Sequence, residues 1–445
     1  MLVWVVAGEY PDARHPARGN FVADQVTALR AEGHEVRVIT SVAPSLRPAA
    51  QAVRPHAEAV LDKVPAVRRL PGLSAVIGGR AQGEARPRGA LEAGGDDLGL
   101  PELPGEAVEL PDPDPKGPRS RSQRAAALAG YTARGLVGAS RVLHDATGNT
   151  VAMARMVGQM RELAAREGLP TVIHAHNVYP AGIAAAQFGP AYGVPVVVTE
   201  HMTAYLRGQY SAVELASAIR VLDRAAAVIA VSKAQAEALP IPTDRIQVVP
   251  NVVAVDAFRL RAPEAAESGC VLAVGKLTPH KRLDMVLRAY AQLPADVRRR
   301  HPLRVVGDGP ERGDLAQLAT SLGLAPSVLV GPLDRAAIVS EFASAAVVVS
   351  ASEVETFGVT LIEALAAGVP FVATDSGGPR DIVGPGLGEL VGRDDEAALG
   401  GALARALALP ADAEADRRRR EEAVARFGPR AVAERLTQIY AGLRG

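Results

Sequence analysis

Two glutamates stand eight positions apart in the segment Glu355-Thr-Phe-Gly-Val-Thr-Leu-Ile-Glu363. An eight-residue step along a helix is a little over two turns, so both carboxylates can fall on one helical face. The helix start between them leaves backbone N–H groups unpaired and favours anions. Two acceptors for sugar or ribose hydroxyls beside a phosphate-binding helix end would suit a nucleotide sugar. The alternative is an ordinary amphipathic helix with solvated glutamates.

A second segment supplies cations. Gly275-Lys-Leu-Thr-Pro-His-Lys281 follows an apolar run and precedes a helical pattern that begins at Leu283. At such a turn between strand and helix, Lys276 and Lys281 could bind a phosphate group, and Arg282 could supply a third positive charge. As isolated surface residues, the same side chains would simply be solvated.

Together, the E-x7-E and G-K-L-x-x-x-K segments resemble the motifs of the retaining GT-B glycosyltransferases, particularly family 4 (glycosyltransferases group 1). The resemblance covers most of residues 1–40 and 171–445. It implies an α/β protein in which two Rossmann-like domains face each other across a cleft. It also implies transfer of a sugar from a nucleoside-diphosphate sugar, UDP- or GDP-linked, to an acceptor hydroxyl, with retention and without a metal or other cofactor. The acceptor could be a polysaccharide, a lipid-linked precursor or a small-molecule natural product.

The resemblance also assigns roles to individual residues. Glu355 would bind the donor sugar and Glu363 the ribose hydroxyls. Lys281 and Lys276 would stabilise the charge that grows on the leaving diphosphate. Lys276 stands where the family usually has arginine, so an ammonium group replaces a guanidinium group that could form two parallel hydrogen bonds. His176 matches the position that hydrogen-bonds the donor sugar near its reacting carbon, and we predict His176, Lys281 and Glu355 as the catalytic residues.

Further substrate contacts are expected in several loops. By resemblance, Gly307 closes the back of the nucleotide pocket and Leu333 meets the nucleobase, while Gly19 and Asn20 form the acceptor-side loop, where the family often has two glycines. His201, at a strand end, would contact phosphate or acceptor. The other predicted substrate-binding residues are Arg282, Thr356, Phe357, Gly358 and Val359.

The histidines do not predict a metal site. Strand alternation puts His174 and His176 on one face, but no third ligand follows at a suitable spacing, and His201 could join only through the tertiary fold. Asp112-Pro-Asp114 matches the metal-binding D-x-D motif only in letters, because it lies in a proline-rich stretch with no strand before it. His174 reads as a core histidine.

Several other enzyme classes lack their motifs in this chain. The first predicted strand is not followed by G-x-G-x-x-G, and neither a Walker A loop nor a G-x-S-x-G elbow occurs. The remaining alternatives are a GT-B sugar-nucleotide epimerase, a phosphorylase, or a catalytically inert nucleotide-sugar-binding protein. Glu355, Lys281 and Glu363 argue against the inert protein.

The elements that must position these residues alternate between apolar runs and helical patterns, which is typical of parallel α/β sheets. We expect an acceptor-binding domain at 1–252 with a Pro/Gly-rich insertion at about 44–118, a donor-binding domain at 253–428, and a helix at 429–445 that crosses back to the first domain. The expected strands are 2–7, 36–40, 171–174, 195–199, 227–231, 270–274, 303–307, 327–330, 346–350 and 371–374. The expected helices include 21–32, 181–188, 431–443 and an interrupted stretch at 122–167.

Composition narrows the setting. A chain of 445 residues suggests two domains, and 49 basic against 49 acidic residues argues against a general nucleic-acid binder. The single cysteine, Cys270, rules out an intrachain disulfide and suits a reducing compartment. The apolar start reads as a buried strand and not as a signal peptide, and no run of about 18 apolar residues occurs. We expect a cytoplasmic enzyme whose basic segment at 119–141 makes at most peripheral membrane contact.

Overall fold

The computed structural model describes residues 1–11, 19–41 and 150–443. Four features predicted from the sequence lie wholly or partly outside these residues: the insertion at about 44–118, Asp112 and Asp114, the basic segment at 119–141, and the first part of the helical stretch at 122–167. The last part of that stretch is described and forms a helix over residues 150–167.

The first half of the chain builds a six-stranded parallel sheet in the order β2-β1-β3-β4-β5-β6. Parallel strands are covered on both faces, so their sequences read as nearly continuous apolar runs. Alternate residues of β1 enter different cores: Trp4 and Val6 lie in one cluster, and Val3 and Val5 in the other. The strands are β1 (Leu2–Ala7), β2 (Glu35–Thr40), β3 (Val172–His176), β4 (Val196–Glu200), β5 (Ala227–Ala230) and β6 (Ile246–Val248).

Helices cover both faces of this sheet. The core beneath Trp4 includes Met156 of the helix over 150–167 and Phe188, whereas the core beneath Val3 includes residues of α1. Ser211 and Glu214 form a capping box that starts α7, so two backbone donors at that helix end are satisfied. The helices are α1 (Asn20–Ala31), α6 (Ile183–Tyr192), α7 (Ala212–Arg224) and α8 (Lys233–Ala238).

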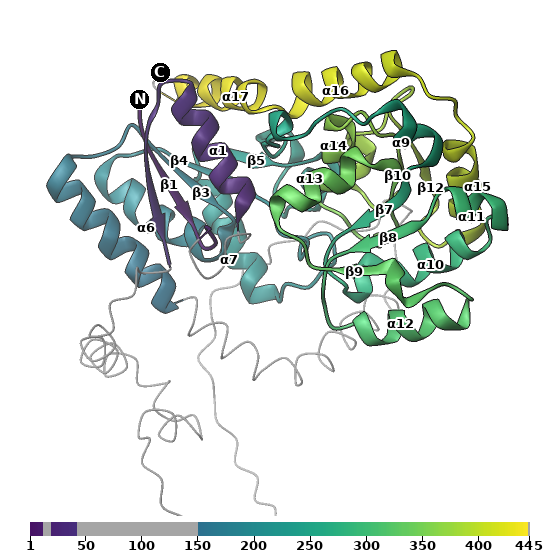
Figure 1. Ribbon diagram of the computed structural model, residues 1–445. Helices are drawn as coiled ribbons and strands as arrows, with labels where there is room; N and C mark the ends of the chain where they lie inside the picture. The colour runs from purple at the N-terminus through teal and green to yellow at the C-terminus, as the bar shows by residue number, and fades with distance from the viewer. Residues whose placement is uncertain (12–18, 42–149, 444–445) are drawn as a thin grey trace, which may run out of the picture. The chain divides into compact units, whose positions relative to one another are not determined.

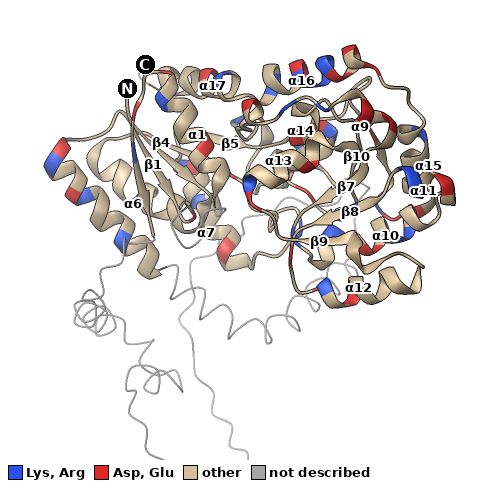
Figure 2. Cartoon of the chain, in the orientation of Figure 1, with Lys and Arg blue, Asp and Glu red and all other residues tan. Residues whose placement is uncertain are grey.

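The second half repeats the plan with a parallel sheet in the order β12-β11-β10-β7-β8-β9. Its strands are β7 (Cys270–Val274), β8 (Leu303–Val306), β9 (Leu329–Gly331), β10 (Ala345–Ser350), β11 (Phe371–Thr374) and β12 (Gly388–Val391). Its helices are α9 (Pro263–Ser268), α10 (Leu283–Ala291), α11 (Ala295–Arg300), α12 (Arg312–Ser321), α13 (Arg335–Ala343), α14 (Val359–Ala366) and α15 (Glu396–Leu407). Figure 2 shows acidic and basic residues interspersed over the helices around both sheets, in keeping with the balanced charge.

The last two helices pack against different halves of the protein. α16 (Ala413–Phe427) packs against α14, and α17 (Pro429–Gly442) packs against α1, beside which it lies in Figure 1. The helical conformation is interrupted between them at Gly428. Pro429 is the first residue of α17, a position where the backbone N–H that proline lacks would have no helical partner. The tail therefore carries residues such as Tyr440 into the core of the first sheet.

The predicted α/β class with two Rossmann-like sheets is confirmed, with local differences. β12 was not predicted, because Gly388-Glu-Leu-Val391 has too few apolar residues to indicate a strand. The strand expected at 327–330 starts later, since a 3-10 turn occupies Pro326–Val328. The helix expected at 181–188 is preceded by a wide turn, η2 (Val178–Gly182), and continues to Tyr192.

Candidate active site

The segment with the two glutamates is not one helix, so the interpretation that both carboxylates share a helical face is wrong. α14 begins at Val359, and Glu355 lies before it in extended chain bridged to Gly377. The backbone N–H of Glu355 donates to the carbonyl of Ser376 at 2.9 Å. Gly358 has a φ of 106°, a conformation that favours glycine, and it turns the chain into the helix. The spacing therefore spans a loop and the first turn of a helix.

Lys281 and Glu355 meet directly. The Lys281 ammonium donates to Oε2 of Glu355 at 2.6 Å, and both side chains are partly exposed. Lys281 ends a 3-10 turn, η5 (Pro279–Lys281), which follows β7. The backbone N–H of Glu353 donates to the carbonyl of His280 at 2.8 Å, which ties the two loops together. The two motifs predicted from the sequence thus share one site.

The two other predicted cations are arranged differently from Lys281. Lys276 is exposed to solvent. Arg282 has a left-handed backbone at the start of α10, and its guanidinium pairs with Asp394 at 2.9 Å and with Asp284 at 3.6 Å. In this arrangement the charge of Arg282 is already matched by two carboxylates, whereas no acid is bound to Lys276 among the described residues.

Glu363 lies one turn into α14 and is 5 % exposed. Its Oε1 accepts a hydrogen bond from Nη1 of Arg335 at 2.6 Å. Burial raises the pKa of Glu363, and the charge of Arg335 opposes that shift. The Arg335 guanidinium also lies over the ring of Phe258, 5.1 Å from its centroid. Sequence reasoning missed Arg335; the only signal was its position at a helix start just after the predicted nucleobase loop.

The predicted glycine loops converge at the ends of neighbouring strands. The backbone N–H of Gly307 donates to the carbonyl of Gly331 at 2.9 Å. Gly307 has a φ of 142°, and a Cβ there would lie 1.8 Å from the carbonyl oxygen of Gly275, so no side chain fits. Leu333 packs, partly buried, against the core that contains α14. The loops after β7, β8 and β9 therefore lie side by side.

The residues at the head of α14 are largely enclosed. Thr356 and Phe357 are buried. The Phe357 ring meets Phe427 of α16 edge-on, with 5.8 Å between the ring centroids. Their side chains therefore belong to the packing, and a ligand would meet mainly backbone groups here. Gly358 and Val359 form the helix start itself.

On the first sheet, β3 and β4 bring three histidines together. His174 and His176 share a face, as predicted, with their rings stacked at 4.6 Å, and His201 stacks on His176 at 5.2 Å. Nδ1 of His176 lies 2.9 Å from Nε2 of His201, and Nε2 of His176 lies 3.2 Å from the amide nitrogen of Gln25. Both ring nitrogens of His176 are thus bonded within the chain. Its predicted contact with the donor sugar would require one of them to change partner.

Burial controls the ionisation of this cluster. It lowers the pKa of His174 and of His201 to about 3, and that of His176 well below its usual value. Glu200 is also fully enclosed, and burial raises its pKa to about 7, opposed by hydrogen bonds from three backbone N–H groups. Those donors belong to Val178, His201 and Met202.

The predicted acceptor-side loop ends at Gly19, which caps α1 with a φ of 66°. A Cβ at Gly19 would lie 2.5 Å from the carbonyl oxygen of Glu9, so glycine is required by space as well as by backbone angle. Asn20 is exposed and is the first residue of α1. Among the described residues, no hydrogen bond, ion pair or ring contact joins either residue to the histidines or to the Lys281–Glu355 pair, although the ring centroid of the next residue, Phe21, lies 4.4 Å from that of His201.

The described residues form neither a metal-binding cluster nor a membrane-spanning helix. No group of three or more His, Cys, Asp and Glu side chains is arranged to hold a metal ion within residues 1–11, 19–41 and 150–443. In the same part of the chain, each helix is too short or too polar to cross a membrane.

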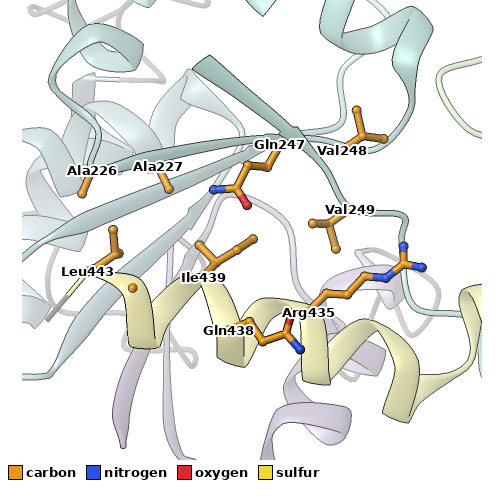
Figure 3. Close-up of a pocket in the computed structure, with 10 residues that line it drawn as sticks. Ala226, Ala227, Gln247, Val248, Val249, Arg435, Gln438, Ile439 and Leu443 are labelled. Atoms are coloured by element: carbon orange, nitrogen blue, oxygen red, sulfur yellow. The ribbon is translucent and has the colours of Figure 1, made fainter. Parts of the chain in front are cut away.

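A cavity of 540 Å³ lies elsewhere, between the β5–β6 edge of the first sheet and α17. Figure 3 shows Gln247 and Ile439 pointing toward one another across it. None of the predicted site residues lines this cavity.

Comparison with protein families identifies both halves. The family described as glycosyl transferases group 1 matches residues 256–426, and glycosyltransferase family 4 matches residues 114–257. The first match contains Lys281, Glu355 and Glu363, and the second contains the three histidines.

Relatives of known activity cover different shares of the chain. A D-inositol 3-phosphate glycosyltransferase of Thermobispora bispora is 30% identical over 301 residues, which are 60% of this chain and 70% of that protein. A GDP-mannose-dependent α-mannosyltransferase of Mycolicibacterium smegmatis is 40% identical over 114 residues, 25% of this chain and 27% of the relative. An exopolysaccharide phosphotransferase of Streptomyces coelicolor is 31% identical over 214 residues, but this chain spans only 22% of its length.

Solved structures agree on the fold. Sucrose-phosphate synthase from Thermosynechococcus elongatus superposes with a TM-score of 0.66 at 20% identity, over 100% of this chain and 99% of the other. HepE of Anabaena, solved with UDP, superposes with a TM-score of 0.54 at 21% identity, over 65% and 82% of the two chains. The chain has the GT-B fold and belongs to the group 1, family 4 glycosyltransferases.

Proposed function

We propose that this glycosyltransferase moves a sugar from a nucleoside-diphosphate sugar to an acceptor hydroxyl, with retention and without a metal ion. The observation that carries the proposal is the Lys281–Glu355 pair beside the start of α14, with Glu363 on the same helix. A cation, a helix start and two carboxylates match the parts of a nucleotide sugar: diphosphate, sugar and ribose.

The chemistry follows from where charge develops. The bond between the anomeric carbon and the diphosphate oxygen breaks while the acceptor oxygen bonds to the same carbon on the same face. The leaving phosphate takes the acceptor proton. Negative charge grows on the diphosphate, so Lys281, Lys276 and the N–H groups at the start of α14 stabilise the transition state more than the bound donor.

Glu355 and Glu363 act by binding. Glu355 would accept hydrogen bonds from the donor sugar, and its second oxygen is not engaged by Lys281. Glu363 would accept from the ribose hydroxyls, and the charge of Arg335 favours the ionised carboxylate against the effect of burial.

Relatives and neighbours indicate which substrates to test. HepE of Anabaena was solved with UDP and with UDP-glucose, and one relative uses GDP-mannose by name. Several relatives are named D-inositol 3-phosphate glycosyltransferases. We therefore propose a UDP- or GDP-linked donor and place a phosphorylated polyol among the acceptors to be tried first, with polysaccharide and lipid-linked acceptors beside it.

The test combines donor binding, nucleotide release and product analysis. Each donor is incubated with and without acceptor, and the anomeric configuration of the product is read by NMR. Nucleotide release that depends on the acceptor and yields a glycoside of unchanged configuration supports the proposal. An inverted product would refute retention, an epimerised donor would favour the epimerase, and donor binding without turnover against a broad acceptor panel would favour the inert binding protein. Glu355→Gln serves as the inactive control.

A further inference from the structure

A continuous chain of hydrogen bonds runs through the histidine cluster from the C-terminal helix. The Tyr440 hydroxyl of α17 lies 2.6 Å from Nδ1 of His174. The amide nitrogen of Gln25 in α1 lies 3.3 Å from the same Nδ1 and 3.2 Å from Nε2 of His176. Nδ1 of His176 lies 2.9 Å from Nε2 of His201. The first four side chains are buried, whereas His201 is partly exposed.

With the amide nitrogen of Gln25 turned toward both histidines, the position of each proton along the chain follows. An amide nitrogen only donates, so Nδ1 of His174 and Nε2 of His176 are acceptors. The proton of His174 then sits on Nε2, which donates to Oγ1 of Thr199 at 2.7 Å. A neutral imidazole has one N–H, so His176 carries its proton on Nδ1 and donates it to His201.

The last ring then has one possible arrangement. Because Nε2 of His201 accepts from His176, its proton sits on Nδ1. That Nδ1 atom is buried and makes no close hydrogen bond among the described residues, and Asn251 is the side chain that favours the protonated His201 ring through hydrogen bonding. Burial keeps all three rings neutral, as their lowered pKa values show. Asn251 therefore supplies the acceptor that this buried donor needs.

We propose that Gln25 is a positioning residue that fixes the tautomers of His176 and His201, so that His201 holds its Nδ1–H toward Asn251. His174 contacts Gln25 from the other side, and Tyr440 in turn contacts His174. The tautomer assignment stands on the chain's own geometry; its effect on turnover rests on the proposed function.

The packing of α17 contributes to this hydrogen-bond network, because α17 carries Tyr440. Tyr440 lies in α17, which continues directly from α16, and α16 packs against α14. The helix that carries Glu363 is therefore linked by packed and covalent contacts to the residue that bonds His174.

The decisive experiment is nitrogen NMR on the full chain with ¹⁵N-labelled histidine, which distinguishes protonated from unprotonated ring nitrogens. Single-histidine variants assign the signals. We expect His176 and His201 with Nδ1 protonated and His174 with Nε2 protonated. A proton on Nε2 of His176 in the unaltered protein would overturn the proposal.

Substitutions at Gln25 test the cause. Gln25→Glu keeps the shape but replaces the donor by an acceptor, so the proton of His176 should move to Nε2. Tyr440→Phe removes a donor to His174 but leaves Gln25 in place, so the tautomer of His176 should persist. Thr27→Val, an exposed position on the same helix, is the matched control and should change nothing. Unchanged His176 signals in folded Gln25→Glu would contradict the assignment.

Kinetics supply a second, separable readout. We expect Gln25→Glu and Gln25→Met to lower kcat about tenfold, the usual loss when a group that orients a functional histidine is removed. Nucleotide affinity, which depends on the second sheet, should stay unchanged. If the unaltered protein transfers no sugar, the proposed function fails while the NMR result still decides the tautomers. Normal kcat in a variant with a reversed tautomer would refute the positioning role.

Discussion

The ammonium group of Lys281 lies 2.6 Å from Oε2 of Glu355, although 74 residues separate them in the chain. Lys281 follows β7 and Glu355 follows β10, and these strands are neighbours in the second sheet. Both side chains remain partly exposed, so a ligand can reach them. A bound diphosphate would compete with Glu355 for the lysine and leave the carboxylate available for sugar hydroxyls.

This relationship predicts unequal effects for the two lysines. Lys281→Ala should lower kcat by about 10²–10³, the range observed when one group that stabilises a developing anion is lost. Lys276→Ala should lower kcat less, because that side chain is exposed and held by no carboxylate in the described chain. Steady-state rates at saturating donor, with urea unfolding of each variant, make the comparison. Rates for both variants equal to that of the unaltered protein would show that this turn is merely solvated.

Glu363 should govern nucleotide affinity. Glu363→Ala should weaken binding by roughly 1.5–3 kcal/mol, the value of a hydrogen bond to a charged group. Calorimetry with UDP and GDP measures it. Arg335 is about half exposed, so losing its partner should destabilise the fold only slightly. Unchanged affinity for each nucleotide that the enzyme uses would contradict the ribose assignment.

The substitution Arg335→Met tests the same site through the pH dependence of nucleotide affinity. Burial raises the pKa of Glu363 and Arg335 opposes it, so removing Arg335 should raise the pKa further. An ionised carboxylate accepts hydrogen bonds from hydroxyls more strongly than the neutral acid does. Nucleotide affinity of the variant should therefore fall more steeply than normal as the pH is lowered. Parallel pH profiles for the variant and the unaltered protein would show that Arg335 does not control this carboxylate.

The proposed mechanism needs no metal, so transfer should survive an excess of EDTA. In this mechanism, lysine side chains and the backbone N–H groups at a helix start stabilise the negative charge of the diphosphate. Initial rates with EDTA, and with added magnesium or manganese, measure this. Loss of activity that a divalent ion restores would overturn the mechanism and direct attention back to His174, His176 and His201.

The sequence predicted much of the fold because parallel strands are buried on both faces. Runs such as Leu2–Ala7 and Cys270–Val274 are continuous and apolar, so they are visible without any partner. β12 was missed because only two of its four residues are apolar, and its pairing with β11 is a tertiary contact. The spacing of Glu355 and Glu363 suggested one continuous helix, but α14 starts only at Val359, after the turn at Gly358. The roles assigned to the two carboxylates remain predictions.

Contacts between distant side chains could not be predicted in the same way. Arg335 and Glu363 are 28 positions apart in the sequence, and Gln25 and His176 are 151 positions apart. Each pair comes into contact only when the tertiary structure has formed. Neither belongs to a motif quoted from the sequence. The strand alternation of His174 and His176 was predictable, but the partner of each ring nitrogen was not.

The buried histidines predict how stability depends on pH. Each has a pKa below its unfolded value of 6.5, so as pH falls below that value the unfolded chain binds protons that the folded chain does not. Each histidine should then lower the free energy of unfolding by up to about 1.4 kcal/mol per pH unit. Glu200 acts with the opposite sign: its pKa is raised from 4.5 to about 7, so the folded chain holds the extra proton between those values.

Two variants separate these contributions. His174→Gln removes one histidine and should make the unfolding free energy less steep in pH, by up to about 1.4 kcal/mol per unit between roughly pH 5 and 6. Glu200→Gln removes the opposing carboxyl and should make it steeper. Urea unfolding at several pH values compares the slopes within one protein, so a uniform loss of stability in either variant does not disturb the result. Slopes that shift in the same direction for both variants would contradict a neutral histidine cluster beside a protonated Glu200.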